Sequence, residues 1–123
     1  MENKKIYIIC PSRRLTSDWK VKIDKHVKEY EDAGYEVYLP YRDADQSQDE
    51  FDICIQNGQA MAAAGEIHVF YLPESSGVNL DLGFCFAMDV FDQPKRIVHV
   101  ATIGGSMKND MSAFIKKWIN FRD

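Results

Sequence analysis

Short apolar runs alternate along this chain with longer segments in which apolar residues recur at helical spacing. Four of the runs have the length of a strand, and a helical segment follows each of them. The predicted strands are residues 5–10, 35–39, 67–72 and 96–101. Strands that are apolar throughout and separated by helices are typical of a parallel sheet covered on both faces. The alternation therefore predicts an α/β fold: a small doubly wound, flavodoxin-like or Rossmann-like three-layer sandwich with a four- to five-stranded parallel sheet.

Helical periodicity defines four segments that follow these strands. Their apolar positions are Trp19, Ile23, Val27 and Tyr30, then Phe51, Cys54, Ile55, Gly58, Met61 and Ala62, then residues 80–91, then Met111, Phe114, Ile115, Trp118 and Ile119. Ser17 is a candidate N-cap of the first helix and Gly34 its stop. No linker or repeat interrupts the pattern, so residues 1–123 are expected to form one domain, with strand order 2-1-3-4.

The composition favours a globular protein and argues against two classes of partner. Of the 123 residues, 46% are apolar and 28% charged, and no apolar run approaches the roughly 20 residues of a membrane span. The net charge of −4 argues against a nucleic-acid polymer, because binding to its backbone needs surplus lysine and arginine. A small molecule is the expected partner. The N-terminus has no signal-peptide pattern, which favours a cytoplasmic location.

The cysteines and histidines form no metal-binding or redox pattern. Cys10, Cys54 and Cys85 are widely spaced without a C-x-x-C pair, which predicts reduced and mostly buried thiols. The three histidines stand at unrelated offsets, and the glycine motifs of dinucleotide and triphosphate sites are absent. No metal and no cofactor is therefore expected.

The predicted fold indicates where a ligand would bind. In an open parallel sheet, ligands lie beyond the carboxyl ends of the strands where the strand order reverses. Here that point falls between the first and third strands, whose following loops are residues 11–17 and 73–81. The first loop contributes Arg13 and Arg14, and the second contributes Gly77 near a predicted helix start.

Both loops are rich in hydroxyl groups, which suits an anion. Guanidinium groups, hydroxyls and free backbone N–H groups together can hold a phosphate. The alternative interpretation is structural. Ser17 and Ser76 would only cap helices, and the arginines would be solvated.

Asp81 is the most informative single residue. It stands in the first turn of the helix predicted over residues 80–91, where the helix N-terminus favours the ionised carboxylate. An ionised carboxylate beside a bound sugar can attack the anomeric carbon or stabilise an oxocarbenium-like centre. The alternative is an acid that only stabilises the helix, by a few tenths to about 1 kcal/mol.

A longer motif surrounds this residue. Residues 75–84, Ser-Ser-Gly-Val-Asn-Leu-Asp-Leu-Gly-Phe, follow the strand around residues 66–71. Together they resemble the nucleoside 2-deoxyribosyltransferase family and its nucleotide N-glycosidase relatives, whose hallmark here is a glycine, a few residues and then Glu-Leu-Gly-Tyr. The first strand and the hydroxyl-rich turn after it also resemble the family, and the order of elements agrees over most of the chain. The resemblance implies hydrolysis of an N-glycosidic bond or 2-deoxyribosyl transfer.

The resemblance also implies roles for individual residues. It places the family's catalytic glutamate on Asp81 and the tyrosine that supports it on Tyr7. Ser75 falls where nucleotide-specific members place a serine against the 5′-phosphate, and Ser12 and Arg13 fall in the loop that nucleotide-cleaving relatives use around that phosphate. The predicted catalytic residues are Asp81 and Tyr7. The predicted substrate-binding residues are Ser12, Arg13, Asn57, Ser75, Ser76, Gly77 and Asn79.

The chain departs from the family's pattern at two positions. Asp81 is one methylene shorter than glutamate, and a nucleophile must come within about 3 to 3.5 Å of the anomeric carbon. Asn57 stands near the place of a family aspartate that handles the base, and an amide is a poor proton donor.

Because of these departures, two alternatives to an enzyme stay open. One is a non-catalytic module that binds or sequesters a nucleotide derivative. The other is an interaction domain whose crevice has no ligand. The resemblance further implies a homo-oligomer, with the apolar helix over residues 80–91 as a candidate contact.

Overall fold

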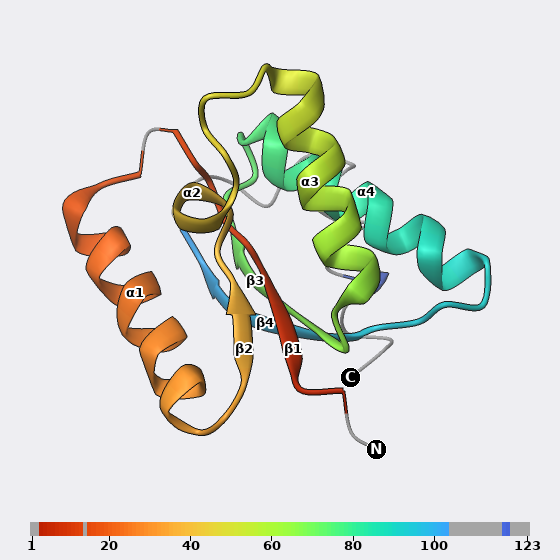
Figure 1. Ribbon diagram of the computed structural model, residues 1–123, viewed down its shortest axis with the longest axis horizontal. Coiled ribbons are helices and arrows are strands. Elements are labelled where there is room, and N and C mark those ends of the chain that lie inside the picture. The colour runs from red at the N-terminus through yellow and green to blue at the C-terminus, as the bar shows by residue number, and fades with distance from the viewer. Residues whose placement is uncertain (1–2, 14, 104–116, 119–123) are drawn as a thin grey trace.

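The computed structural model describes residues 3–13, 15–103 and 117–118 of the chain. Its strands are β1 (Lys5–Ile9), β2 (Glu36–Tyr38), β3 (Glu66–Tyr71) and β4 (Arg96–Thr102). All pairings among them are parallel, in the order β2-β1-β3-β4 (Figure 1). The predicted parallel sheet and its strand order are confirmed.

Helices cover both faces of this sheet. They are α1 (Ser17–Asp32), α2 (Pro40–Asp43), α3 (Glu50–Ala63) and α4 (Ser76–Val90). Helix α1 lies over one face, and α3 and α4 lie over the other (Figure 1). This is the predicted three-layer α/β sandwich.

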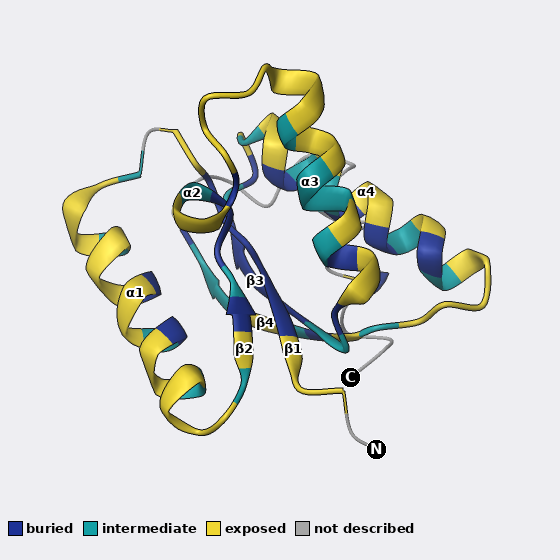
Figure 2. Ribbon diagram, viewed as in Figure 1, coloured by how far each residue is buried: buried dark blue, intermediate teal, exposed yellow. Residues whose placement is uncertain are grey.

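Strand β1 is the centre of the core. Its residues from Ile6 to Ile9 are each at most 1% exposed. Successive side chains of a strand point to opposite faces, and here Tyr7 and Ile9 join the cluster under α3 and α4, whereas Ile6 and Ile8 join the cluster under α1. In Figure 2, the buried positions of the helices lie on the sides that face the strands.

The chain directly after β2 forms a short helix. Pro40 follows the predicted strand 35–39 and begins α2. Proline suits the first helical position because its missing N–H would have no partner there. Asp43 closes the turn by accepting a hydrogen bond from the Leu39 N–H at 2.8 Å.

Two predicted helix starts are wrong, because capping side chains set the observed ones. Thr16, not Ser17, caps α1, because its hydroxyl accepts from the Trp19 N–H. Helix α4 begins at Ser76, four residues before the predicted start, because the Ser75 hydroxyl accepts from the Val78 N–H at 3.2 Å. The apolar stripe on which the prediction rested does not include the polar residues of the first turn.

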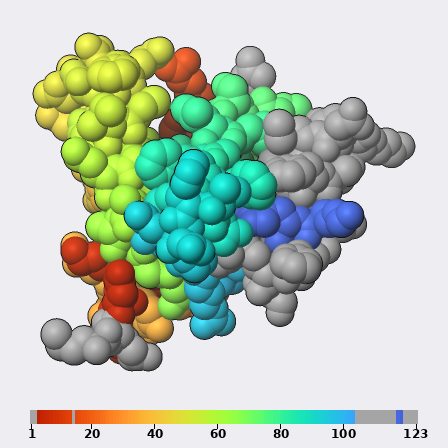
Figure 3. Space-filling model, turned by 90° about the vertical axis from the view of Figure 1, so that its right-hand side faces the viewer, coloured from red at the N-terminus to blue at the C-terminus, as the bar shows by residue number. Residues whose placement is uncertain are grey.

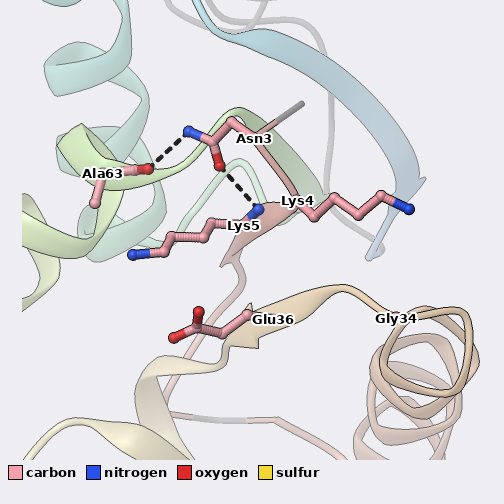
Figure 4. Close-up of a pocket in the computed structure, with 6 residues that line it drawn as sticks. All are labelled: Asn3, Lys4, Lys5, Gly34, Glu36 and Ala63. Atoms are coloured by element: carbon pink, nitrogen blue, oxygen red, sulfur yellow. Dashed lines mark hydrogen bonds between the residues drawn. The ribbon is translucent and has the colours of Figure 1, made fainter. Parts of the chain in front are cut away.

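The amino edge of the sheet is closed by side-chain contacts to the end of α3. Asn3 Nδ2 donates to the Ala63 carbonyl at 3.0 Å, and Asn3 Oδ1 accepts from the Lys5 N–H at 2.9 Å. Lys95 Nζ donates to the Ala62 carbonyl. A shallow pocket of about 440 Å³ lies here (Figure 4). It is at the edge opposite the predicted ligand site.

The predicted last helix, over residues 111–119, lies outside the described residues except for 117–118. Within the described part, Trp118 is buried, and its Nε1–H donates to Asp89 Oδ2 at 3.1 Å. No helix in the described ranges is long and apolar enough to cross a bilayer.

Two glycines with open space around them give a matched test of the backbone. Gly34 follows α1 with φ at +95°, whereas Gly83 lies within α4, and a Cβ at either position would meet nothing within 4 Å. We expect Gly34→Ala to lower the free energy of unfolding by about 1–2 kcal/mol, because a side chain disfavours the left-handed conformation. Gly83→Ala should raise it by up to about 1 kcal/mol. Urea denaturation measures both, and a Gly34→Ala protein as stable as the wild type would contradict this assignment.

Candidate functional site

Asp81 lies on the face of α4 that turns toward the sheet. Helical spacing puts it in line with Val78 and Cys85, both of which are buried. Directly across this layer, the hydroxyl of Tyr7 in β1 donates to Asp81 Oδ2 at 3.2 Å, although the two residues are 74 positions apart in the chain. The structure therefore brings together the two predicted catalytic residues.

Burial, more than the helix dipole, sets the acidity of this carboxyl group. Asp81 was predicted to stand in the first turn of its helix. Because α4 begins at Ser76, it stands in the second turn. Burial raises the pKa of Asp81 to about 6, and the hydrogen bond from Tyr7 opposes that rise. At neutral pH the group is still mostly ionised.

Tyr7 is held in its protonated form. Its side chain is fully buried. Burial raises the pKa of Tyr7 far above its usual range, and the charge of Asp81 raises it further. The phenol can therefore act only as a hydrogen-bond donor to the carboxylate.

A second tyrosine extends this arrangement to Asn57. Tyr38 of β2 is the register partner of Tyr7, and their rings stack with centroids 5.5 Å apart and planes 13° apart. The Tyr38 hydroxyl donates to Asn57 Oδ1 of α3 at 3.3 Å. Asp81, Tyr7, Tyr38 and Asn57 thus form a polar line through the layer under α3 and α4. Sequence reasoning missed Tyr38, because the strand order alone does not give the register that places it beside Tyr7.

In the loop after β1, Arg13 contacts α3. Ser12 and Arg13 are exposed, and Arg13 Nη2 pairs with Glu50 Oε1 at 3.2 Å, both side chains being more than 80% exposed. So open an ion pair contributes little to stability, and a stronger anion could displace it. Among the described residues, no hydrogen bond or ion pair joins Arg13 to the loop after β3. Arg14 lies outside them.

In the loop after β3, some polar groups already form hydrogen bonds within the loop and the start of α4. Ser75 serves as the N-cap of α4, a role that the structural alternative gave to Ser76. Ser76 and Gly77 are exposed at the helix start. Asn79 Nδ2 donates to the Pro73 carbonyl at 3.0 Å, but Asn79 Oδ1 is buried and accepts no hydrogen bond in the described structure. Such an acceptor costs about 1–3 kcal/mol, which a bound hydroxyl or water would recover.

The cysteines are all free. Cys10 and Cys85 are buried and Cys54 is exposed, so the expectation of mostly buried thiols is confirmed. Cys10 follows β1 near Asp81, and burial raises the pKa of its thiol to about 12. A protonated thiol is a poor nucleophile. Within the described ranges, no group of three or more His, Cys, Asp or Glu side chains could hold a metal ion.

A shallow hollow of about 630 Å³ lies between α1 and α2, away from Asp81. The polar side chains that line it bond to one another. Tyr41 donates to Asp24 at 2.6 Å, and Arg42 pairs with Glu31 and with Asp43. These contacts fasten α2 to α1 and leave the described donors and acceptors of this hollow engaged.

No family model matches this chain, and no curated protein is significantly similar to it in sequence. The family resemblance of residues 75–84 is therefore supported only by the residues that carry it. The roles predicted for Ser12, Arg13 and the helix-start residues stay predictions.

The hydrogen bond between Tyr7 and Asp81 can be tested by titration. Tyr7→Phe removes the donor that lowers the pKa of Asp81, so this pKa should rise above about 6. Tyr38→Phe is the matched control, because its hydroxyl bonds to Asn57 and not to Asp81. NMR of the Asp81 carboxyl carbon measures both. Equal values in the two variants would contradict the hydrogen bond.

Proposed function

We propose that the protein binds a nucleotide or nucleoside-like ligand at the carboxyl ends of β1 and β3 and acts on its N-glycosidic bond through Asp81. The observation that carries this proposal is the hydrogen bond from the buried Tyr7 hydroxyl to Asp81. It orients one carboxylate oxygen inside the layer and leaves the other oxygen for a ligand. The resemblance of residues 75–84 supports the same assignment.

The environment of Asp81 suits chemistry at an anomeric carbon. A partly buried carboxylate with a pKa near 6 is more basic than an exposed one and interacts more strongly with a developing positive charge. Its oxygen would form a bond to the anomeric carbon as the C–N bond breaks, and the electron pair would leave with the base, which takes a proton from solvent. Water as acceptor then gives hydrolysis, and a second base gives transfer.

The start of α4 suits a phosphate. Asn79 N–H already donates to the Ser75 carbonyl, and Val78 N–H donates to the Ser75 hydroxyl. The N–H groups of Ser76 and Gly77 have no acceptor among the described residues, and both residues are exposed. Free N–H groups at the positive end of a helix bind anions. Ser12 and Arg13 follow the neighbouring strand and would add a hydroxyl and a positive charge.

The rival function is a binding module without catalysis. Two observations favour it: Asp81 is shorter than the glutamate of the resembling family, and Asn57 cannot supply a proton to a leaving base. Asn57 Oδ1 is already engaged by Tyr38, so its amide hydrogens are the groups that would be left to bind a ligand. Such an amide can bind a base edge without assisting its departure.

Asp81→Asn separates these functions. The protein would be incubated with ribo- and deoxyribonucleoside 5′-monophosphates and with free nucleosides, while base release and melting temperature are followed. We expect base release, reduced by about 10²-fold or more in Asp81→Asn, because the nucleophile is lost. Asp52→Asn, an exposed carboxylate on α3, is the control and should keep the wild-type rate.

Each other outcome has a distinct meaning. Ligand-induced melting shifts without base release would support the binding module, since a ligand that binds only the folded state raises its stability. Release that persists in Asp81→Asn would remove Asp81 from the mechanism. Neither shifts nor release with any compound would reject both functions.

We also propose that the protein is a homo-oligomer. Large apolar side chains are exposed on α3 and α4, which lie side by side on one surface (Figure 3). They are Phe51, Ile55, Leu80, Phe84 and Val90, with Phe91 at the end of α4. Phe84 extends across α3, where a Cβ on Gly58 would lie 3.6 Å from its ring. Apolar side chains gathered on one face are typical of a protein–protein contact, and a two-fold contact uses the same face twice.

Light scattering with size-exclusion chromatography tests this contact. We expect a dimer or larger assembly for the wild type, and dissociation by the double variant Ile55→Gln with Phe84→Gln. Val21→Gln is the control, because Val21 is also exposed (67%) but lies on α1, in the opposite layer. A wild type that elutes as a monomer at all concentrations would overturn the proposal.

A further inference from the structure

Three polar side chains form a hydrogen-bonded chain between α1 and the sheet, on the face opposite Asp81. Glu66 and His68 belong to β3 and His26 to α1. His68 Nε2 lies 3.0 Å from Glu66 Oε1, and His68 Nδ1 lies 2.8 Å from His26 Nε2. The His68 side chain has no exposed surface. This chain of bonds plays no part in the proposed chemistry.

The hydrogen bonds fix where the protons sit when both rings are neutral. An ionised Glu66 can only accept, so His68 donates through Nε2. A neutral imidazole has one N–H, so His68 Nδ1 is bare and accepts from the Nε2–H of His26. Both hydrogen bonds are then satisfied, with one tautomer for each ring.

The pair can hold one extra proton but not two. A proton added to Nδ1 of His26 leaves its Nε2–H donating to His68. A second proton would have to sit on His68 Nδ1, and two N–H groups would then face each other across 2.8 Å. The ring of Phe70 meets His26 edge-on, and Tyr30 meets His68 edge-on. A second proton would therefore replace the hydrogen bond between His26 and His68 with repulsion between two N–H groups.

The surrounding charges act in both directions. Burial lowers the pKa of His68, and Arg96 of β4 lowers it too, whereas Glu66 raises it. Burial and a charged His68 lower the pKa of His26, and Glu29 of α1 raises it. The net shift of both groups is downward. At these two histidines the folded protein thus binds fewer protons than the unfolded chain below about pH 6.5, so their contribution to stability falls as the pH falls.

We propose that His26, His68 and Glu66 form a proton-sensitive latch that holds α1 on β3 and releases it when both imidazoles are charged. Helix α1 directly follows the loop that carries Ser12 and Arg13. Release of the latch would therefore disturb that loop, whether or not it binds a phosphate. The latch is independent of the proposed function, because Asp81 lies in the other layer.

Urea unfolding of the full chain between about pH 5 and pH 8 tests the latch. A difference of one bound proton changes the unfolding equilibrium constant about tenfold per pH unit. As the pH falls below about 6.5, the unfolding equilibrium constant of the wild type should rise at least this steeply once the contribution of Asp81 is subtracted. Asp81 acts in the opposite direction, because its pKa is raised in the folded protein. His26→Gln should lower the slope by about one proton, because its amide can either donate to His68 or accept from it.

His99→Gln is the matched control. His99 is exposed on β4 and bonds only to Thr102 among the described contacts, so its loss should leave the acid-side slope unchanged relative to the wild type. Asp81 is present in all three proteins, so its contribution cancels in the comparison. Equal slopes for the wild type and His26→Gln would overturn the proposal.

A second measurement uses only the wild type. Nitrogen NMR of the imidazoles near pH 7.5 should find the His68 proton on Nε2, with Nδ1 bare. Hydrogen exchange near pH 5.5 should be faster for buried α1 amides relative to those of β1 than at neutral pH. A proton on His68 Nδ1 at neutral pH, or α1 protection that does not change with pH, would overturn the latch.

Discussion

The burial of β1 on both faces is the constraint on which this structure depends. Because every side chain from Ile6 to Ile9 is inaccessible to solvent, each face needs its own layer of helices. A polar group in this strand must find its partner inside a layer, since an unpaired buried hydroxyl would cost stability. Tyr7 finds that partner in Asp81. The need of this buried hydroxyl for a hydrogen-bond partner therefore also fixes the geometry of the candidate site.

Asp81 destabilises the folded protein. A carboxyl group whose pKa is raised from 3.8 to about 6 destabilises the folded state at neutral pH by on the order of 2–3 kcal/mol. An apolar residue at this inward position of α4 would avoid that cost. Buried charges that weaken a fold are typical of functional sites, which is the physical reason to propose a functional role for Asp81. The histidines under α1 are a parallel case, because burial also opposes their charge.

The sequence predicted the features that depend on local pattern. Strand positions followed from continuous apolar runs, and the parallel sheet followed from the helices between them. The pairing of Tyr7 with Asp81 was predicted through a family resemblance, and the contact is present. The start of α4 was predicted four residues late because capping by Ser75 leaves no apolar signal. Tyr38 was missed because its importance comes from strand register, which a single sequence does not show.

The amino-acid sequence by itself determined the layers of this protein, because hydrophobic periodicity decides which segments become buried strands and which become amphipathic helices. It also determined which loops meet at the carboxyl edge. Only the tertiary structure decided the electrostatics. The pKa values of Asp81 and His68 depend on desolvation by residues far away in the chain. The same packing encloses His68 between Glu66 and His26. Desolvation is a property of the packed core, and no local pattern encodes it.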